Sequence, residues 1–204
     1  MHNAILPVSY LGSIQYYSKL KKYENCSIEL YENLPKQTYR SRCNIYSPNG
    51  LLTLSIPLIK RNHRQVMKDV KISYDYDWRK THWRTLESSY RSSPFFEYYE
   101  DDLYPYYHDK KKDYLIDLNE SLQQKILQFL KLNKTYNFTN EYQKECSNAV
   151  DFRSSLSSKL PSSNDSEFII KPYIQVFENK YNFIPNLSIV DLLFNQGSRA
   201  IDYI

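Results

Sequence analysis

Glycine is scarce in this chain, with only 3 glycines among 204 residues, far below the usual level of about 7%. A Rossmann-type G-x-G-x-x-G loop needs three glycines within six residues, and a Walker A loop needs two around its phosphate turn. Gly12, Gly50 and Gly197 are too far apart to supply either motif. The sequence therefore excludes a nucleotide site built on a glycine-rich phosphate loop.

Long apolar runs are also missing. No segment approaches the roughly 18 apolar residues that suggest a transmembrane helix. Residues 1–7 contain neither a basic region nor an apolar stretch of signal-peptide length. We therefore expect a cytoplasmic protein without a transmembrane segment. The 3 cysteines are odd in number and lack C-x-x-C spacing, so neither a disulfide framework nor a zinc knuckle is indicated.

The charge balance is mild, with 27 Lys plus Arg against 23 Asp plus Glu and a net charge of +4. Domains that bind nucleic acid usually carry a clustered basic face and a higher pI. The short basic segment 60–64 lies between strand-like runs and is typical of a solvated loop. We expect no nucleic-acid partner. The four histidines form no ligand set and H-E-x-x-H is absent, so no metal is predicted and no motif identifies a cofactor.

Hydrophobic periodicity predicts an alternation of strands and helices. Strands are expected at 4–8, 26–31, 42–46, 51–56, 66–72, 137–142 and 173–176, and helices at 14–20, 77–90, 95–107, 118–132 and 187–194. Ser13, Asp77 and Asp117 are expected helix N-caps, and Gly50 is expected in a hairpin turn.

This order of elements favours an α/β or α+β fold. We expect a single domain over residues 1–204, with a mixed sheet and flanking helices in a Rossmann-like arrangement. Residues 151–165 are rich in Ser, Lys and Asn and are expected to form an exposed loop.

Two arginines form the first candidate site. Arg40 and Arg42 lie two apart in a segment that enters a predicted strand, so their side chains share one face. Two guanidinium groups on one face suit bidentate capture of carboxylate or phosphate. The alternative is a pair of surface arginines in ordinary ion pairs. Glu29 and Glu32 are near Arg40 in sequence only.

The segment 78–84 (W-R-K-T-H-W-R) forms the second candidate site. Trp78 and His82 lie one helical turn apart, and Arg84 belongs to a basic strip on the same helix. Nearby cations would lower the pKa of His82 and keep its imidazole neutral, which suits a general base or hydrogen donor. The alternative is a packed core histidine.

An aromatic run from Phe95 to Tyr107 offers a third possibility. Aromatic rings stack on sugar faces and on bases, so exposed rings here would suit a carbohydrate platform. Helical periodicity supports the plainer alternative that Phe95, Tyr99 and Leu103 pack on the core.

Ordered motifs extend these observations over essentially the whole chain. The most specific are 5–12 (I-L-P-x-x-Y-L-G), 31–43 (Y-E-N-x-P-K-Q-T-Y-R-x-R-C), 78–84 (W-R-x-x-H-W-R) and 187–197 (L-S-I-V-D-L-L-F-N-x-G). In these motifs the chain resembles the WbqC-like family, in its short Bacteroidetes-type branch. The broader family opens with H-Q-P-x-Y-L-P, and this chain has Leu6 in place of that histidine and Gly12 in place of the last proline.

The resemblance implies a bacterial enzyme of O-antigen-like surface polysaccharide biosynthesis. We expect a transferase that moves an acyl, aminoacyl or nucleotidyl-type group on a sugar, with a nucleotide-sugar or activated acyl compound as its small-molecule substrate. His82 would be the catalytic base, and the expected substrate- or anion-binding residues are Lys36, Tyr39, Arg40, Arg42, Trp78 and Arg84. The alternative is a non-catalytic scaffold that binds carbohydrate or protein through a Tyr-rich surface.

Overall fold

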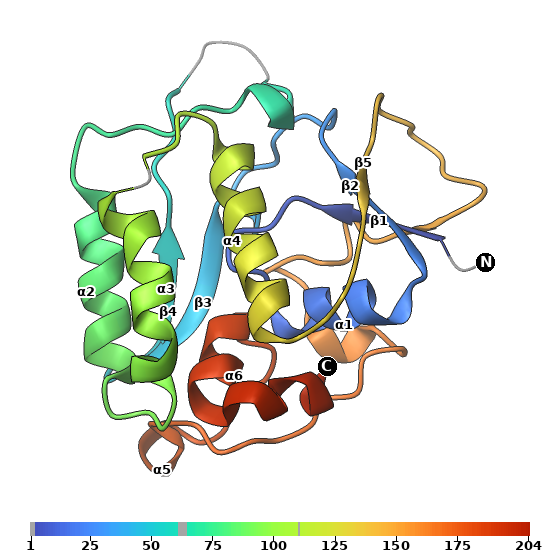
Figure 1. Cartoon of the computed structure of the whole chain (residues 1–204). Helices are drawn as coiled ribbons and strands as arrows, with labels where there is room; N and C mark the ends of the chain where they lie inside the picture. Colours follow the sequence, from blue (N-terminus) through green and yellow to red (C-terminus); the bar gives the residue numbers. More distant parts are fainter. Residues whose placement is uncertain (1–2, 61–64, 110) are drawn as a thin grey trace.

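A computed structural model describes residues 3–60, 65–109 and 111–204 (Figure 1). Most of the basic segment 60–64 therefore lies outside the described residues. The first sheet is parallel, with strand order β5-β2-β1-β6: β1 (Asn3–Pro7), β2 (Asn25–Glu29), β5 (Asn137–Phe138) and β6 (Val150–Asp151). The second sheet is an antiparallel hairpin of β3 (Arg42–Ser47) and β4 (Gly50–Ser55). The predicted α/β fold is confirmed, and its parallel and antiparallel pairings lie in two separate sheets.

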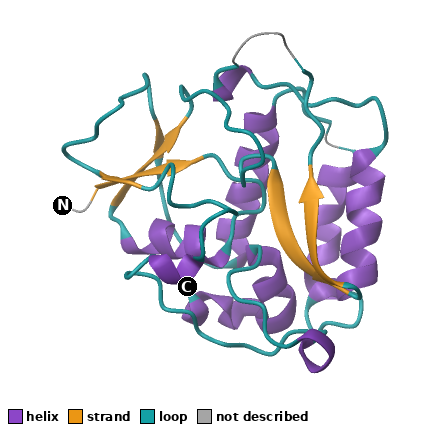
Figure 2. Ribbon diagram, turned by 180° about the vertical axis from the view of Figure 1, so that it is seen from behind, coloured by secondary structure: helices purple, strands orange, loops and turns teal. Residues whose placement is uncertain are grey.

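Helices fill the space between and around these sheets. The longer ones are α1 (Ile14–Lys22), α2 (Trp78–Tyr90), α3 (Phe96–His108), α4 (Leu115–Phe129) and α6 (Ile189–Gln196). The shorter ones are α5 (Glu178–Tyr181) and the 3₁₀ turns η1 (Met67–Asp69), η2 (Ser162–Asn164) and η3 (Gly197–Tyr203). Figures 1 and 2 show α2 and α3 side by side along the hairpin, and α4 between the hairpin and the parallel sheet. Within the described residues no helix has both the length and the apolar character needed to cross a bilayer.

Local sequence signals account for several element boundaries. The side chain of Ser13 accepts a hydrogen bond from the backbone N–H of Tyr16, and Asp77 caps α2 in the same way. Gly50 takes a φ of 94° in the hairpin turn, a conformation that L-residues rarely adopt. The predicted cap at Asp117 is wrong, because α4 begins one turn earlier at the fully buried Leu115. Asp117 instead lies in the first turn, where a carboxylate interacts favourably with the helix dipole.

Two predicted strands are wrong. Within residues 66–72, Met67–Asp69 form η1, and the Met67 N–H donates to the carbonyl of Glu32. Val66, Lys71 and Ile72 make only isolated β-bridges. Residues 173–176 form no strand, because the Gln175 side chain satisfies both backbone groups of Ile184 and Glu178 accepts from the Gln175 N–H. In both places side chains or loops supply the hydrogen bonds that a strand would have supplied.

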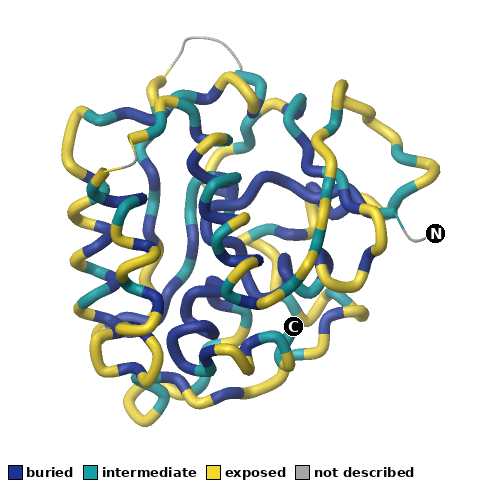
Figure 3. The backbone as a smooth tube through the Cα atoms, viewed as in Figure 1, coloured by how far each residue is buried: buried dark blue, intermediate teal, exposed yellow. Residues whose placement is uncertain are grey.

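Tyrosines make up much of the hydrophobic core, which runs through the centre of the molecule (Figure 3). Tyr99, Tyr106 and Tyr107 are buried on α3, whereas Tyr98 is 77% exposed. The prediction from helical periodicity is confirmed for Tyr99 and Leu103, which are buried, and is wrong for Phe95, which is 37% exposed just before α3. Other buried tyrosines are Tyr10, Tyr16, Tyr17, Tyr23, Tyr46, Tyr90 and Tyr173.

The segment 151–165 is part exposed and part anchored. Phe152 and Leu156 are buried, and most of the residues between 157 and 164 are exposed. At its end, Asp165 accepts hydrogen bonds from the Gln15 amide and from the ammonium of Lys19, which is itself only 1% exposed. A buried lysine needs a carboxylate partner, so this contact fixes the segment against α1.

Candidate functional site

Charged side chains gather where the parallel strands end. β2 ends at Glu29 and β6 ends at Asp151, and Glu32 and Arg153 follow within three residues of these strand ends. The carboxyl ends of parallel strands meet at one edge of a sheet, and open α/β sheets bind their ligands beyond that edge. The four side chains therefore lie where this fold class usually carries its site.

Arg153 links two of the strands through ion pairs. Its Nε donates to Asp151 at 2.9 Å and its Nη2 donates to the other carboxylate oxygen of Asp151 at 2.7 Å. Its Nη1 donates to Glu29 at 2.9 Å, and Glu29 is only 1% exposed. Hydrogen bonds from Arg153 hold the pKa of Asp151 below its usual range. Arg153 therefore joins the ends of β2 and β6 and leaves little of its own donor capacity free.

Arg40 makes a second ion pair beside the first. Its Nε and Nη2 donate to the two carboxylate oxygens of Glu32 at 2.6 and 2.7 Å, and Nη2 also donates to the carbonyl of Arg153 at 2.9 Å. Arg40 and Glu32 are 2% and 8% exposed. Burial raises the pKa of Glu32, and the guanidinium of Arg40 opposes that rise. Asn119 on α4 holds the Arg40 backbone by donating to its carbonyl at 2.8 Å.

These ion pairs form the floor of an open cavity of about 470 Å³, called here the sheet-edge cavity. Its lining residues are Glu32, Pro35, Lys36, Thr38, Arg40, Tyr142, Lys144, Asp151, Arg153, Ser154, Ser157 and Lys159. Lys36, Lys144 and Lys159 are exposed, and none of them has an ion-pair partner among the described residues. The cavity therefore offers three ammonium groups that have no ion-pair partner among the described residues. Below them three carboxylates, of Glu29, Glu32 and Asp151, face the two guanidinium groups of Arg40 and Arg153, so the cavity keeps an excess of positive charge, which suits an anion.

A tight turn orients the loop that carries Arg40. Gln37 has a φ of 57°, and the N–H of Ser41 donates to the carbonyl of Thr38. The carbonyl of Tyr39 accepts from the N–H of Tyr10 at 2.8 Å, which ties the loop to the segment after β1. Thr38 and Arg40 face the sheet-edge cavity, whereas Tyr39 lines a different cavity on the other side of the loop.

The residues predicted from sequence as a single site are therefore divided. Lys36 and Arg40 line the sheet-edge cavity, and Tyr39 lies on the far side of the same loop. Arg42 on β3 is half-buried, and Arg84 on α2 is exposed. Neither arginine lines the sheet-edge cavity.

His82 and Trp78 lie in the core on α2, at 4% and 1% exposure. Nδ1 of His82 is 3.0 Å from the hydroxyl of Tyr10, which is 2.9 Å from the hydroxyl of Tyr107. The ring centroids of Trp78 and His82 are 5.0 Å apart. Burial lowers the pKa of His82 to about 4, so its imidazole is neutral at pH 7. The sequence correctly predicts that the pKa of His82 is lowered. In the structure the cause is burial of the ring rather than neighbouring cations.

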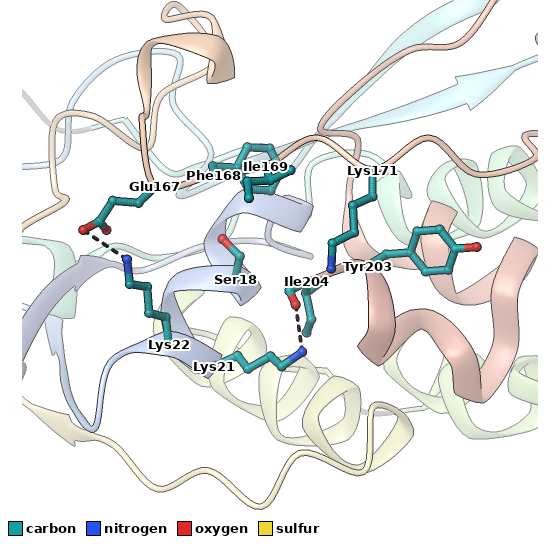
Figure 4. Close-up of a pocket in the computed structure, with 9 residues that line it drawn as sticks. All are labelled: Ser18, Lys21, Lys22, Glu167, Phe168, Ile169, Lys171, Tyr203 and Ile204. Atoms are coloured by element: carbon teal, nitrogen blue, oxygen red, sulfur yellow. Dashed lines mark hydrogen bonds and ion pairs between the residues drawn. The ribbon is translucent and has the colours of Figure 1, made fainter.

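A second cavity, of about 360 Å³, lies between α1 and the C-terminal segment (Figure 4). It also contains three lysines, but each of them already has a partner. Lys22 pairs with Glu167 at 3.2 Å, Lys21 donates to the carbonyls of Ile201 and Ile204, and Lys171 donates to the carbonyl of Asp202. Lysines that cap helix carbonyls in this way stabilise the C-terminal η3 segment. This cavity is a weaker candidate for an anion site.

Comparison with known proteins identifies the family of this chain. The model of the WbqC-like protein family matches residues 8–164. The chain belongs to the WbqC-like family. A relative from Mycobacterium tuberculosis (strain ATCC 25618 / H37Rv), the uncharacterized protein Rv1507c, is 28% identical over 195 residues, which span 83% of this chain and 82% of that protein. No solved structure gives a significant match.

The WbqC-like match also separates the two cavities. Every lining residue of the sheet-edge cavity, from Glu32 to Lys159, falls within the matched residues 8–164. Most of the lining of the second cavity, from Glu167 to Ile204, lies beyond the match. The sheet-edge cavity is therefore the better candidate for a property that WbqC-like chains have in common.

Sequence reasoning missed half of the ion-pair layer in this WbqC-like chain. Glu32 is expected to be near Arg40 in sequence only, and this expectation is wrong because the two side chains are joined by two hydrogen bonds. Asp151 and Arg153 were hidden in a segment whose composition indicates a loop. The available signal was Glu29, a carboxylate inside the strand predicted at 26–31. Within the described residues, no three His, Cys, Asp or Glu side chains are arranged to hold a metal ion.

Proposed function

We propose that this protein is a cytoplasmic transferase of cell-surface polysaccharide biosynthesis that moves an acyl, aminoacyl or nucleotidyl-type group on a sugar substrate. The resemblance to WbqC-like proteins supports the biological setting. The sheet-edge cavity supports the chemistry, because the activated donors of such reactions carry a phosphate or carboxylate group.

The observation that carries the proposal is the charge of the cavity. Lys36, Lys144 and Lys159 are exposed at its walls and make no ion pair among the described residues. Ammonium groups in a concave site attract anions and raise their local concentration. Arg40 and Arg153 already hold carboxylates, so in this proposal they keep the floor rigid while the three lysines contact the donor's phosphate.

The transfer step needs a group that accepts a proton. The hydroxyl oxygen of the sugar forms a bond to the carbonyl carbon or phosphorus of the donor. The donor's leaving group, a phosphate or, for an acyl-CoA, the thiolate, departs with the electron pair of the broken bond. Glu32 lines the cavity, and its raised pKa makes its carboxylate a better base than an ordinary surface glutamate. In this proposal the Glu32 carboxylate accepts the proton of the sugar hydroxyl.

The catalytic role of His82 stays a prediction, because its ring lines none of the cavities described above. The two assignments give different results in one activity assay. With Glu32 as the base, Glu32→Gln abolishes product formation per mole of folded protein, whereas His82→Gln leaves product formation per mole of folded protein unchanged. Loss of activity in a fully folded His82→Gln protein would show that His82, and not Glu32, is the catalytic base.

A thermal-shift screen tests the anion site. UDP-sugars, ATP, acyl-CoAs and free amino acids are added to the wild-type protein, and a ligand at 100 times its Kd stabilises by about 2.7 kcal/mol. For a chain of this size that corresponds to a rise in Tm of roughly 5–11 °C. Lys36→Ala and Lys159→Ala should reduce the shift, and Lys80→Ala, which removes an exposed lysine of α2, should not. An equal shift in all three variants, or no shift with any phosphate compound, would refute the proposed anion site.

A further inference from the structure

A cavity of about 300 Å³ lies behind the loop that forms one wall of the sheet-edge cavity. It is called here the neutral cavity, because none of its lining residues carries a charge. It is bounded by Tyr39, by the β3–β4 hairpin at Asn44 and Leu51, by residues 160–163 and by residues 184–187. Its size lies at the lower end of the range for small-molecule sites, about 300–1,000 Å³.

The two cavities share their dividing wall. Thr38 and Arg40 line the sheet-edge cavity and Tyr39 between them lines the neutral cavity. The same change of side occurs between Lys159, which lines the first cavity, and Leu160, which lines the second. Consecutive Cα atoms are only about 3.8 Å apart, so at two places the wall is as thin as one stretch of backbone.

The lining of the neutral cavity combines the Tyr39 ring and seven aliphatic or proline residues with four uncharged hydrogen-bonding side chains, Asn44, Ser162, Ser163 and Asn186. The hydroxyl of Tyr39 is 3.5 Å from the Asn44 amide, and burial raises the pKa of Tyr39, so the phenol stays protonated. The hydroxyls of Ser162 and Ser163 have no hydrogen bond within the described chain. A ring that covers a C–H face, together with hydroxyl and amide groups that bond to hydroxyls, suits a polyhydroxylated ligand without charge.

We propose that the neutral cavity binds an uncharged sugar unit of the acceptor, next to the anionic donor in the sheet-edge cavity. This inference rests on the proposed function for the identity of the reaction, but the binding itself does not depend on it. The absence of charge from the lining disfavours uronic acids and sugar phosphates, which would have to give up hydration without gaining an ionic partner. The substrate class is therefore a neutral glycan, and the negative charge of the reaction resides on the donor.

Saturation-transfer NMR with methyl N-acetyl-β-glucosaminide and methyl β-glucoside tests this site. Ser163→Trp should fill the cavity and abolish the signal of the bound glycoside. Ser166→Trp is the matched control, because Ser166 is exposed on the same segment and lines neither cavity. Tyr39→Ala should weaken binding by about tenfold through loss of the ring face, and Tyr39→Phe should weaken it less.

Binding of UDP, measured by calorimetry on the same proteins, separates this inference from the proposed function. Ser163→Trp should leave the UDP affinity unchanged, whereas Lys36→Ala should reduce it and leave glycoside binding intact. Glycoside binding that is absent from the wild-type protein, or equal in wild-type and Ser163→Trp proteins, overturns the neutral sugar site. Absence of UDP binding with the glycoside still bound overturns only the anion site.

Discussion

Replacement of Arg40 by alanine should destabilise the protein strongly, because it leaves the Glu32 carboxylate buried without its partner. Arg40 is 2% exposed and makes two hydrogen bonds to Glu32 at 2.6 and 2.7 Å. Removal of one member of a buried ion pair costs about 3–5 kcal/mol. For a chain of this length that loss corresponds to a fall in Tm of roughly 6–20 °C.

A second variant isolates the cause of this loss. Arg40→Met combined with Glu32→Leu replaces both charges by apolar side chains, a change that is often close to neutral for buried pairs. The carbonyl of Arg153 loses the same donor in the single and the double variant. The difference between the two therefore reports the unpaired carboxylate together with the buried volume that methionine restores, and the double variant should be more stable than Arg40→Ala by about 2 kcal/mol or more.

Urea denaturation followed by circular dichroism measures these differences, with Arg42→Ala as the control. Arg42 lies two residues further along, is half-buried on β3 and has no side-chain partner among the described residues. Its removal should change the free energy of unfolding by about 0.5 kcal/mol or less. A loss in Arg40→Ala no larger than that in Arg42→Ala would refute the reasoning. So would a double variant that is less stable than Arg40→Ala.

The remaining predictions concern pH and backbone strain. Folding lowers the pKa of His82 from 6.5 to about 4. As the pH falls from 6.5 to 4, the unfolded state therefore binds a proton at His82 while the folded state does not. Denaturation curves should show a loss of about 3 kcal/mol in the free energy of unfolding over this pH range. Burial raises the pKa of Asp191 from 3.8 to about 6, so the stability that its protonated carboxyl contributes is lost as the pH rises through this range. As the pH falls from 6 to 4, Asp191 therefore offsets part of the stability lost at His82. Asp191→Asn removes this offset and should make the free energy of unfolding fall more steeply between pH 6 and 4. Gly50→Ala should cost about 1–2 kcal/mol for its positive φ, and Gly197→Ala should cost more in the same denaturation assay. At Gly197 the φ is 58°, and a Cβ would lie 2.7 Å from the Phe95 ring.

The parts of the fold that were predicted are those with local signals. Ser13 and Asp77 cap helices because their side chains reach N–H groups three residues ahead, and Gly50 is placed by the turn geometry it alone tolerates. These interactions span a few residues and can be recognised without knowledge of the tertiary structure. The α/β class follows from the same local patterns in sequence.

The strand β6 could not be predicted in this way, whereas β5 falls inside the strand expected at 137–142. Each is only two residues long, and each pairs with a strand more than one hundred residues away in sequence. Two residues are too few to show the alternating pattern of a strand, so the prediction depends on composition alone. The Ser, Lys and Asn residues of 151–165 indicate a loop. The unpredicted strand β6 is the one that carries Asp151 to the edge of the sheet. Because β6 was not predicted, Asp151 was not predicted as part of the candidate site.

The distinction between paired and unpaired cations decides which predicted residues can meet a ligand. From sequence, Arg40 and Lys36 are equivalent basic residues in one motif. In the structure Arg40 holds Glu32 and the carbonyl of Arg153, whereas Lys36 is exposed and has no ion-pair partner among the described residues. A ligand that bound Arg40 directly would have to displace a buried carboxylate, at a cost that a phosphate contact would have to exceed. A ligand on Lys36 displaces only water, so the lysines are the groups through which this cavity recognises an anion, and the arginines act by holding its shape.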